Sequence, residues 1–299
     1  MRSRAKAGWA GIGMLALLGA GGWRLERRIQ PLQPQLAQAR NPRLALPSAR
    51  AVRALFLNYN GLAADVYWTR AVQYFGRQHL AHRNAYPLLW PLLRICQRLD
   101  PDLIAPAEFG SYFLADRPPL GAGEPHQAVQ LLQRAIARHP NHWRLYFDLG
   151  FVYGLNLHQR RLAAAAFAAG AKRPGANPVL YTLAAEWYGQ AHQDQLALAL
   201  WRELYRSTAN RMLRENARDH ILQLETRIAM RQLEAVTAAY AQRYHRPPAS
   251  WQQVVRAGLL PAIPLDPMGN AYLLRPQGKV GLNPATRLPW MKHALAKTP

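Results

Sequence analysis

The chain has 299 residues, half of them apolar, which is enough for a folded core and argues against global disorder. Its 38 Lys and Arg residues outnumber 16 acidic residues, for a formal charge of +22. Such a charge is compatible with a nucleic-acid or anionic-lipid partner. However, the arginines are scattered and no nucleic-acid-binding motif is present, so we interpret them mainly as solvated helix faces. The single Cys96 excludes a disulfide framework and predicts a small buried core residue.

Residues 1–28 predict an N-terminal transmembrane helix. Ala7 to Trp23 form 17 consecutive uncharged positions with basic residues on both sides. A cleaved signal peptide is the alternative, because Gly19-Ala20-Gly21 offers small residues at a cleavage point. We favour an uncleaved anchor, since Trp23 and the arginines after it suit a helix end at the lipid headgroups. The basic residues before the span place that end inside, so the expected location is a bacterial inner membrane, single-pass, with the rest in the periplasm.

A tether and a first helix are predicted next. Residues 29–48 contain four prolines, spaced too closely for a long helix, so they indicate a proline-rich tether between membrane and folded domain. Ser48 is a suitable N-cap for a helix from Ala49 to Tyr59.

Residues 49–211 predict a series of helical hairpins. The segment from His142 to Pro174 has large side chains at helical spacing, namely Tyr146, Leu149 and Tyr153 in a first helix and Phe167 in a second. Gly150 and Ala163 are small enough to let the two helices approach closely. Comparable first helices begin near Trp68, Pro106 and Tyr181, and comparable second helices begin near Leu89, Ala128 and Ala197.

The spacing of these anchors resembles the tetratricopeptide repeat (TPR) over roughly residues 65–210. Successive first-helix anchors are 38, 40 and 35 residues apart, and second-helix anchors are 39, 35 and 34 apart. The resemblance implies a mostly α fold, a right-handed α-solenoid of about four hairpins. The first two hairpins carry enlarged inner loops at 77–86 and 117–125. An irregular all-helical bundle is the alternative.

The C-terminal part differs in kind. Residues 212–245 predict one long helix, or two separated by a bend, that caps the solenoid. Residues 246–283 predict a small α+β appendage with a helix capped by Ser250, a tight turn at Asp266-Pro267-Met268-Gly269-Asn270, and a hairpin of the runs 271–274 and 279–282. Residues 284–299 are expected to form a basic tail.

The appendage is similar to the C-terminal end of type II secretion pseudopilins. The matching stretches are His245-Arg246-Pro247-Pro248 and Asp266 to Tyr272. Met268 stands where those proteins have Trp, and no prepilin cleavage site opens the chain. The resemblance therefore indicates an assembly partner of that machinery and not a pilin.

No catalytic, cofactor-binding or metal-binding residues are predicted. The sequence has no phosphate-binding glycine loop, nucleophile elbow, zinc-protease helix or haem-attachment motif. His79 with His82, and His139 with His142, have a spacing that a metal site can use, but carboxylates and thiols are lacking around them. We therefore expect that the chain is not an enzyme.

The TPR resemblance implies a concave groove lined by the first helix of each hairpin and open to a protein partner. The residues expected to line it are Gln73, Arg77, Ser111, Arg144, Phe147, Phe151, Glu186 and Gln190. The predicted function is a non-enzymatic, membrane-tethered scaffold in a bacterial envelope assembly, with a pilus or type II secretion machine as the assembly suggested by the appendage. The alternatives are an accessory structural subunit of a larger membrane complex, and a basic module that binds nucleic acid or anionic lipid.

Overall fold

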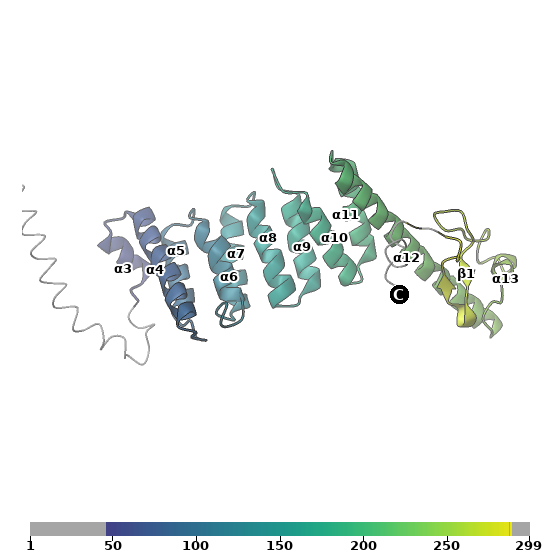
Figure 1. Cartoon of the computed structure of the whole chain (residues 1–299), viewed down its shortest axis with the longest axis horizontal. Helices are drawn as coiled ribbons and strands as arrows, with labels where there is room; N and C mark the ends of the chain where they lie inside the picture. The colour runs from purple at the N-terminus through teal and green to yellow at the C-terminus, as the bar shows by residue number, and fades with distance from the viewer. Residues whose placement is uncertain (1–45, 287, 289–299) are drawn as a thin grey trace, which may run out of the picture. The chain divides into compact units, whose positions relative to one another are not determined.

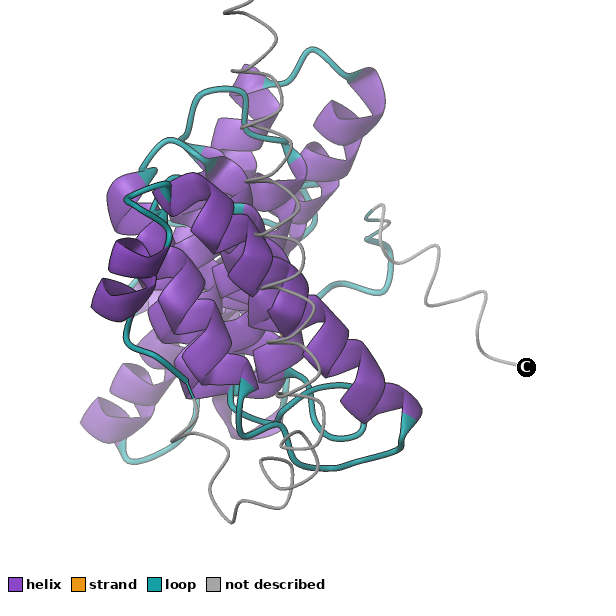
Figure 2. Cartoon of the chain, turned by 90° about the vertical axis from the view of Figure 1, so that its left-hand side faces the viewer, coloured by secondary structure: helices purple, strands orange, loops and turns teal. Residues whose placement is uncertain are grey.

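The computed structural model describes residues 46–286 and Leu288 (Figure 1). The predicted anchor, most of the predicted tether and the end of the predicted basic tail lie outside these residues. Helices make up most of the described chain (Figure 2). The chain divides into two compact units between Glu124 and Pro125, at a point inside the second predicted hairpin.

The described part of the N-terminal unit consists of helices joined by loops. Its helices are α3 (Ala49–Leu55), α4 (Asn60–Leu80), α5 (Leu89–Leu99) and α6 (Ala105–Ala115). The rings of Phe75 on α4 and Phe113 on α6 stack with centroids 4.1 Å apart, and Trp68 stacks on the same Phe113 ring at 6.4 Å. Cys96 is fully buried on α5, which confirms the predicted core position. Burial raises the pKa of its thiol to about 12, so the thiol stays protonated and unreactive at neutral pH.

Helix α3 begins where the sequence predicts and ends earlier. The Ser48 side chain accepts a hydrogen bond from the Ala51 amide at 3.2 Å, which confirms the predicted N-cap. The predicted extension to Tyr59 is wrong, because Leu57 and Asn58 have left-handed backbones with φ of 52° and 66°. A right-handed helix cannot continue through two such residues.

The two enlarged loops of this unit contact each other. The Tyr86 hydroxyl donates to the Pro119 carbonyl oxygen at 2.8 Å, and the His79 ring nitrogen Nδ1 lies 2.9 Å from the same oxygen. The extra residues in both loops therefore form a tertiary contact that joins the first hairpin to the loop after α6.

The C-terminal unit contains the remaining helices. They are α7 (Pro125–Arg138), α8 (Trp143–Phe151), the π-helix η3 (Val152–Asn156), α9 (Arg160–Ala171), α10 (Val179–Gln190), α11 (Asp194–Ser207), α12 (Arg211–Tyr244) and α13 (Trp251–Arg256). With α4, α5 and α6, this set includes all eight helices expected from the repeat spacing. Within the units, α4 packs against α5, α8 against α9 and α10 against α11, as in TPR-like hairpins.

Glycines let the paired helices approach closely, as predicted for Gly150. A Cβ atom added there would lie 2.5 Å from the Phe167 ring of α9. The π-helix that continues α8 was not predicted from the sequence. At its centre, a Cβ on Gly154 would lie 2.6 Å from the Trp187 ring of α10, so this glycine also permits a close contact.

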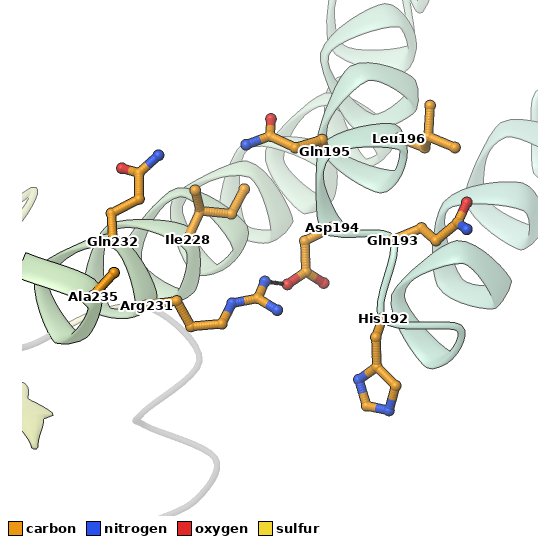
Figure 3. Close-up of a pocket in the computed structure, with 9 residues that line it drawn as sticks. All are labelled: His192, Gln193, Asp194, Gln195, Leu196, Ile228, Arg231, Gln232 and Ala235. Carbon is orange, nitrogen blue, oxygen red and sulfur yellow. Dashed lines mark ion pairs between the residues drawn. The ribbon is translucent and has the colours of Figure 1, made fainter. Parts of the chain in front are cut away.

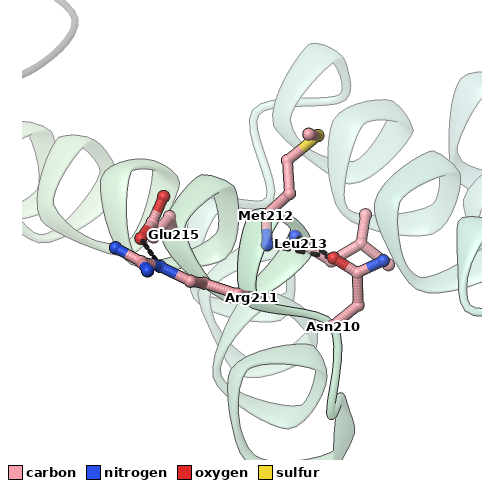
Figure 4. A network of polar contacts seen from close by, with 5 residues as sticks. All are labelled: Asn210, Arg211, Met212, Leu213 and Glu215. Atoms are coloured by element: carbon pink, nitrogen blue, oxygen red, sulfur yellow. Dashed lines mark hydrogen bonds and ion pairs between the residues drawn. The ribbon is translucent and has the colours of Figure 1, made fainter.

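Helix α12 is a single helix of 34 residues, not two. Asn210 caps its start, because its Oδ1 accepts from the amides of Met212 at 2.9 Å and Leu213 at 3.2 Å (Figure 4). Arg211 and Glu215 form an exposed ion pair of 2.8 Å in the first turn. At the other end, His245 has a left-handed backbone that ends the helix.

Two hydrophobic clusters share α12. In its first half, Ala217 and Leu224 pack against α11, whose Trp201 is 1 % exposed, so this half covers α11 as predicted for a cap. In its second half, Leu233 and Tyr240 pack against the appendage. The same helix therefore closes the last hairpin and carries the C-terminal module.

The appendage confirms the predicted hairpin and turn. Strand β1 (Leu273–Leu274) pairs antiparallel with β2 (Val280–Gly281) around the 3-10 turn η4 (Pro276–Gly278). The buried Asp266 carboxylate accepts from the amides of Met268 at 2.8 Å and Asn270 at 3.0 Å, which closes the predicted turn. Ser250 occupies the predicted N-cap position before α13, but its side chain forms no capping hydrogen bond with the described start of this helix.

Candidate functional site

A pocket of about 480 Å³ lies between the start of α11 and the middle of α12 (Figure 3). Its lining from the α10–α11 turn and α11 is His192, Gln193, Asp194, Gln195 and Leu196, and its lining from α12 is Ile228, Arg231, Gln232 and Ala235. The residues predicted to bind a partner are not among these.

The pocket is built around Asp194, which is only 5 % exposed. It is the first residue of α11, where the helix dipole favours a negative charge. Arg227 Nε donates to Asp194 Oδ2 at 3.1 Å, and the guanidinium groups of Arg227 and Arg231 both form ion pairs with this carboxylate. The two arginines are four residues apart on α12, so they lie on one face and reach the same partner.

The arginines remain open to solvent on their outer side. The Arg227 side chain is 47 % exposed and the Arg231 side chain 51 %, whereas the carboxylate between them is covered. Two cations against one anion leave a surplus positive charge, and Arg231 presents it in the lining of this pocket. An incoming carboxylate would meet guanidinium groups that are already positioned by Asp194.

A second pocket, of about 290 Å³, lies along the same stretch of α12. Its lining is Gln223, Thr226, Arg227, Met230, Arg231, Glu234 and Leu282. Glu234 forms an ion pair of 3.5 Å with Lys279, so these two charges offset each other. Arg231 lines both pockets, which makes it the cation common to the whole site.

Two further contacts hold α11 against α12 beside the site. The Trp201 and His220 rings stack with centroids 4.1 Å apart and an interplanar angle of 5°. Burial lowers the pKa of His220 below its ordinary value, while Glu186 and Asp219 act in the opposite direction. The ring is therefore mainly neutral at pH 7, which suits a stacked position. Arg202 and Glu225 add an ion pair of 2.6 Å.

The predicted groove residues of the N-terminal unit have different environments. Gln73 and Arg77 are exposed on α4, as a surface role requires. The surface position predicted for Ser111 is wrong, because the residue is 0 % exposed and its hydroxyl donates to the Glu108 carbonyl at 2.8 Å. A short side chain on the packed face of α6 satisfies its hydroxyl within its own helix.

In the C-terminal unit, Arg144, Glu186 and Gln190 are exposed as expected, but the two phenylalanines are half-buried. Phe147 and Phe151 meet edge to face at 4.8 Å, and both pack on the buried Phe167, at 6.2 and 5.2 Å. These rings therefore contribute to the core between α8 and α9. The role of the exposed residues in partner binding stays a prediction.

The Asp194 site was missed because its partners are 33 residues or more away in the chain. A usable signal was present in the sequence. It consists of an acidic residue at the start of one helix and the Arg227-x3-Arg231 pair on the next. Without the crossing of α11 and α12, these three residues read as ordinary solvated charges.

The described residues contain no group of three or more His, Cys, Asp or Glu side chains placed to hold a metal ion. Of the histidine pairs that have metal-site spacing in the sequence, His79 contacts the Pro119 carbonyl, and His82 has a left-handed backbone. No helix within residues 46–286 combines the length and apolar character needed to cross a membrane.

Comparison with known proteins gives a structural similarity and no sequence match. No family model matches the sequence, and no curated protein matches it. Among solved structures, the chain is similar to a thermophilic TPR protein of Thermus thermophilus. The match has 19 % identity and a TM-score of 0.33, and it covers 58 % of this chain and 96 % of that chain. At this score the TPR-like fold rests on the helical pairing itself and not on the similarity.

Proposed function

We propose that the chain is a non-enzymatic scaffold that binds a segment of a partner protein in the pocket between α11 and α12. The observation that carries this proposal is the half-exposed Arg231, which lies beside the apolar side chains of Leu196 and Ile228 in one hollow. A cation and apolar surface in the same pocket suit a polypeptide segment better than a small polar metabolite.

The pocket also defines the chemistry of the segment. Its surplus guanidinium charge favours a carboxylate, and its apolar floor favours an aliphatic or aromatic side chain near that carboxylate. The carboxamides of Gln193, Gln195 and Gln232 can donate to and accept from a peptide backbone. The proposed partner segment is therefore short, acidic and partly apolar.

The surroundings proposed for this scaffold derive from the sequence alone. The uncharged run from Ala7 to Trp23 supports a membrane tether, with the helical hairpins on the periplasmic side. The likeness of the appendage to pseudopilins supports a pilus or type II secretion assembly as the setting. Arg144, Glu186 and Gln190, exposed on α8 and α10, offer a further contact surface in the same unit.

Site-specific photo-crosslinking of the full chain tests the proposal. A photoreactive residue at Gln232, in the pocket, is compared with one at Gln242, which is exposed on the same helix outside it. We expect a discrete protein adduct from Gln232 and none from Gln242. A synthetic peptide of the crosslinked segment should then bind the chain, and Arg231→Gln should weaken that binding about tenfold, the loss of one charge-assisted contact.

Equal yields of adduct at Gln232 and Gln242 would show that the partner contacts α12 without using the pocket. A peptide whose affinity is unchanged by Arg231→Gln would remove the pocket from the proposal even if the partner is genuine.

A further inference from the structure

One face of α4 is exposed although half of it is apolar. Leu62 and Val66 are 59 % and 38 % exposed, and Arg70, Gln73 and Arg77 continue the same face toward the end of the helix. The opposite face packs against α5 through buried residues, namely Ala63, Ala64, Tyr67 and Ala71. The helix therefore has one face used by the fold and one that no described element covers.

The turn that directly precedes α4 in the chain also exposes apolar side chains. Leu55 and Leu57 are 78 % and 79 % exposed, and Tyr59 is 69 % exposed. Leu57 has φ of 52°, a left-handed conformation that is unfavourable for a leucine. The turn is held by backbone hydrogen bonds, since the Asn58 amide donates to the Arg53 carbonyl at 2.9 Å. The fold thus keeps two leucines in water in a defined position.

The charge around this surface is positive. Residues 46–80 contain four arginines and one acidic residue, Asp65. Arg50 is exposed on α3 beside the turn, and the Arg53 guanidinium donates to the Arg98 carbonyl at the end of α5, which fixes its position. Arg70 lies over the Tyr67 ring, with its guanidinium carbon 5.0 Å from the ring centre.

We propose that this surface, which consists of Leu55, Leu57, Tyr59, Leu62 and Val66 with Arg50 and Arg53, rests on an anionic phospholipid bilayer. Apolar and tyrosine side chains at the boundary of the acyl region, with arginines reaching phosphates, are the composition of an interfacial surface. Long arginine side chains place their stems along apolar surface and their charge at the headgroups.

Other occupants fit the observations less well. A nucleic acid would use the arginines but leave the exposed leucines in water. In the chain, the surface directly follows residues 1–45, which include the uncharged run 7–23. The 22 residues from 24 to 45 can span at most about 75 Å, so a bilayer entered by that run is within reach.

The single buried cysteine permits a direct test on the full chain. Leu57→Cys is labelled with an environment-sensitive fluorophore, and Cys96 stays unlabelled because burial raises its pKa to about 12. Met212→Cys, at an equally exposed position of 78 %, is the control. Both proteins are mixed with vesicles of phosphatidylglycerol and phosphatidylcholine that carry a nitroxide on the acyl chain.

We expect a blue shift and nitroxide quenching of the Leu57 probe and neither change at Met212. Combined Arg50→Glu and Arg53→Glu substitutions, or vesicles of phosphatidylcholine alone, should remove most of the quenching. Leu62→Cys supplies an independent reading if Leu57→Cys disturbs the strained turn, and circular dichroism checks that each variant is folded.

Absence of quenching at both Leu57 and Leu62 would overturn the proposal, as would equal quenching at Met212.

Iodide quenching without vesicles identifies the other occupants. A Leu57 probe protected from iodide at every protein concentration is covered by the chain itself. A probe protected only at high concentration is covered by a second copy, and one protected by duplex DNA is a nucleic-acid site. Each of these results contradicts the lipid proposal.

Discussion

The first and the last predicted hairpins differ in what covers their outer helices. On α11 of the last hairpin, Leu198, Trp201 and Leu204 are all buried because α12 folds back along them. On α4 of the first hairpin, Leu62 and Val66 stay exposed although they are as apolar. A helical hairpin must have its apolar face covered by a neighbour or used in a contact. On α11 that face is closed by α12, whereas Leu62 and Val66 on α4 are available for contact.

Polar contacts also differ between the α11–α12 interface and the exposed face of α4. The α11–α12 interface has ion pairs and a stacked histidine that tie the two helices together. Within residues 46–286, Arg70 on the exposed face of α4 has a ring contact and no carboxylate partner. Charged side chains therefore hold α11 and α12 together, whereas on the exposed face of α4 they face solvent.

The largest expected effect comes from removing the centre of the covered interface. Trp201→Ala deletes a buried ring stacked on His220, so we expect a loss of roughly 3–5 kcal/mol in the free energy of unfolding. Urea unfolding followed by circular dichroism measures this loss. A loss below about 1 kcal/mol would mean that α12 does not cover α11 in solution.

Asp194→Asn should have the next largest effect. The substitution leaves two arginines facing a neutral group, but both are half-exposed and can be hydrated, so the expected loss is about 1–2 kcal/mol. Glu225→Gln, which removes an exposed partner of Arg202, is the matched control and should cost at most about 0.5 kcal/mol. Equal losses for the two variants, measured by urea unfolding, would show that burial of Asp194 contributes nothing.

A smaller effect is expected from pH. Burial lowers the pKa of His220, so the unfolded chain binds this proton more tightly than the folded chain. The stability that the neutral His220 ring contributes is fully present above the unfolded pKa near 6.5, and it is lost as pH falls toward the lowered pKa of the folded state. His220→Gln should reduce the loss of stability between about pH 7 and 5.5. Urea midpoints at both pH values give the comparison.

The smallest effect is expected on the open face. Leu62→Ala removes an exposed side chain, so the free energy of unfolding should change by no more than about 0.5 kcal/mol in buffer without lipid. A loss as large as that of Trp201→Ala would show that this face is packed in solution. The contrast between the exposed face of α4 and the covered face of α11 would then disappear.

Periodicity made much of the helical architecture predictable. Anchors such as Tyr146 and Phe167 recur at a spacing that specifies paired helices, and Gly150 marks the place where they approach. The turn at Asp266 was also predictable, because an Asp carboxylate that closes a turn on nearby amides is a local interaction. Prediction from local sequence failed at three places where a helix begins, ends or changes its type. The end of α3 and the π-helix after α8 were not predicted, and Ser250 at the N-cap of α13 lacks the side-chain hydrogen bond expected of a cap.

The candidate site was less predictable than the fold. Sequence spacing assigned Ser111, Phe147 and Phe151 to a groove, but a helix position has a surface role only if the neighbouring helix leaves it open. Ser111 lies on a packed face, and the two phenylalanines fill the space beside Phe167. Helical periodicity indicates which residues share a face and does not indicate which face is covered.

The sequence by itself determined the helices of the repeat region, the buried Cys96 and the order of elements in the appendage, because these follow from short-range spacing and turn chemistry. Only the tertiary structure decided that Asp194 meets Arg227 and Arg231, and that α4 keeps an apolar face in water. Both depend on how one helix crosses another. That crossing is set by the summed packing of many side chains and cannot be read from any one stretch of the chain.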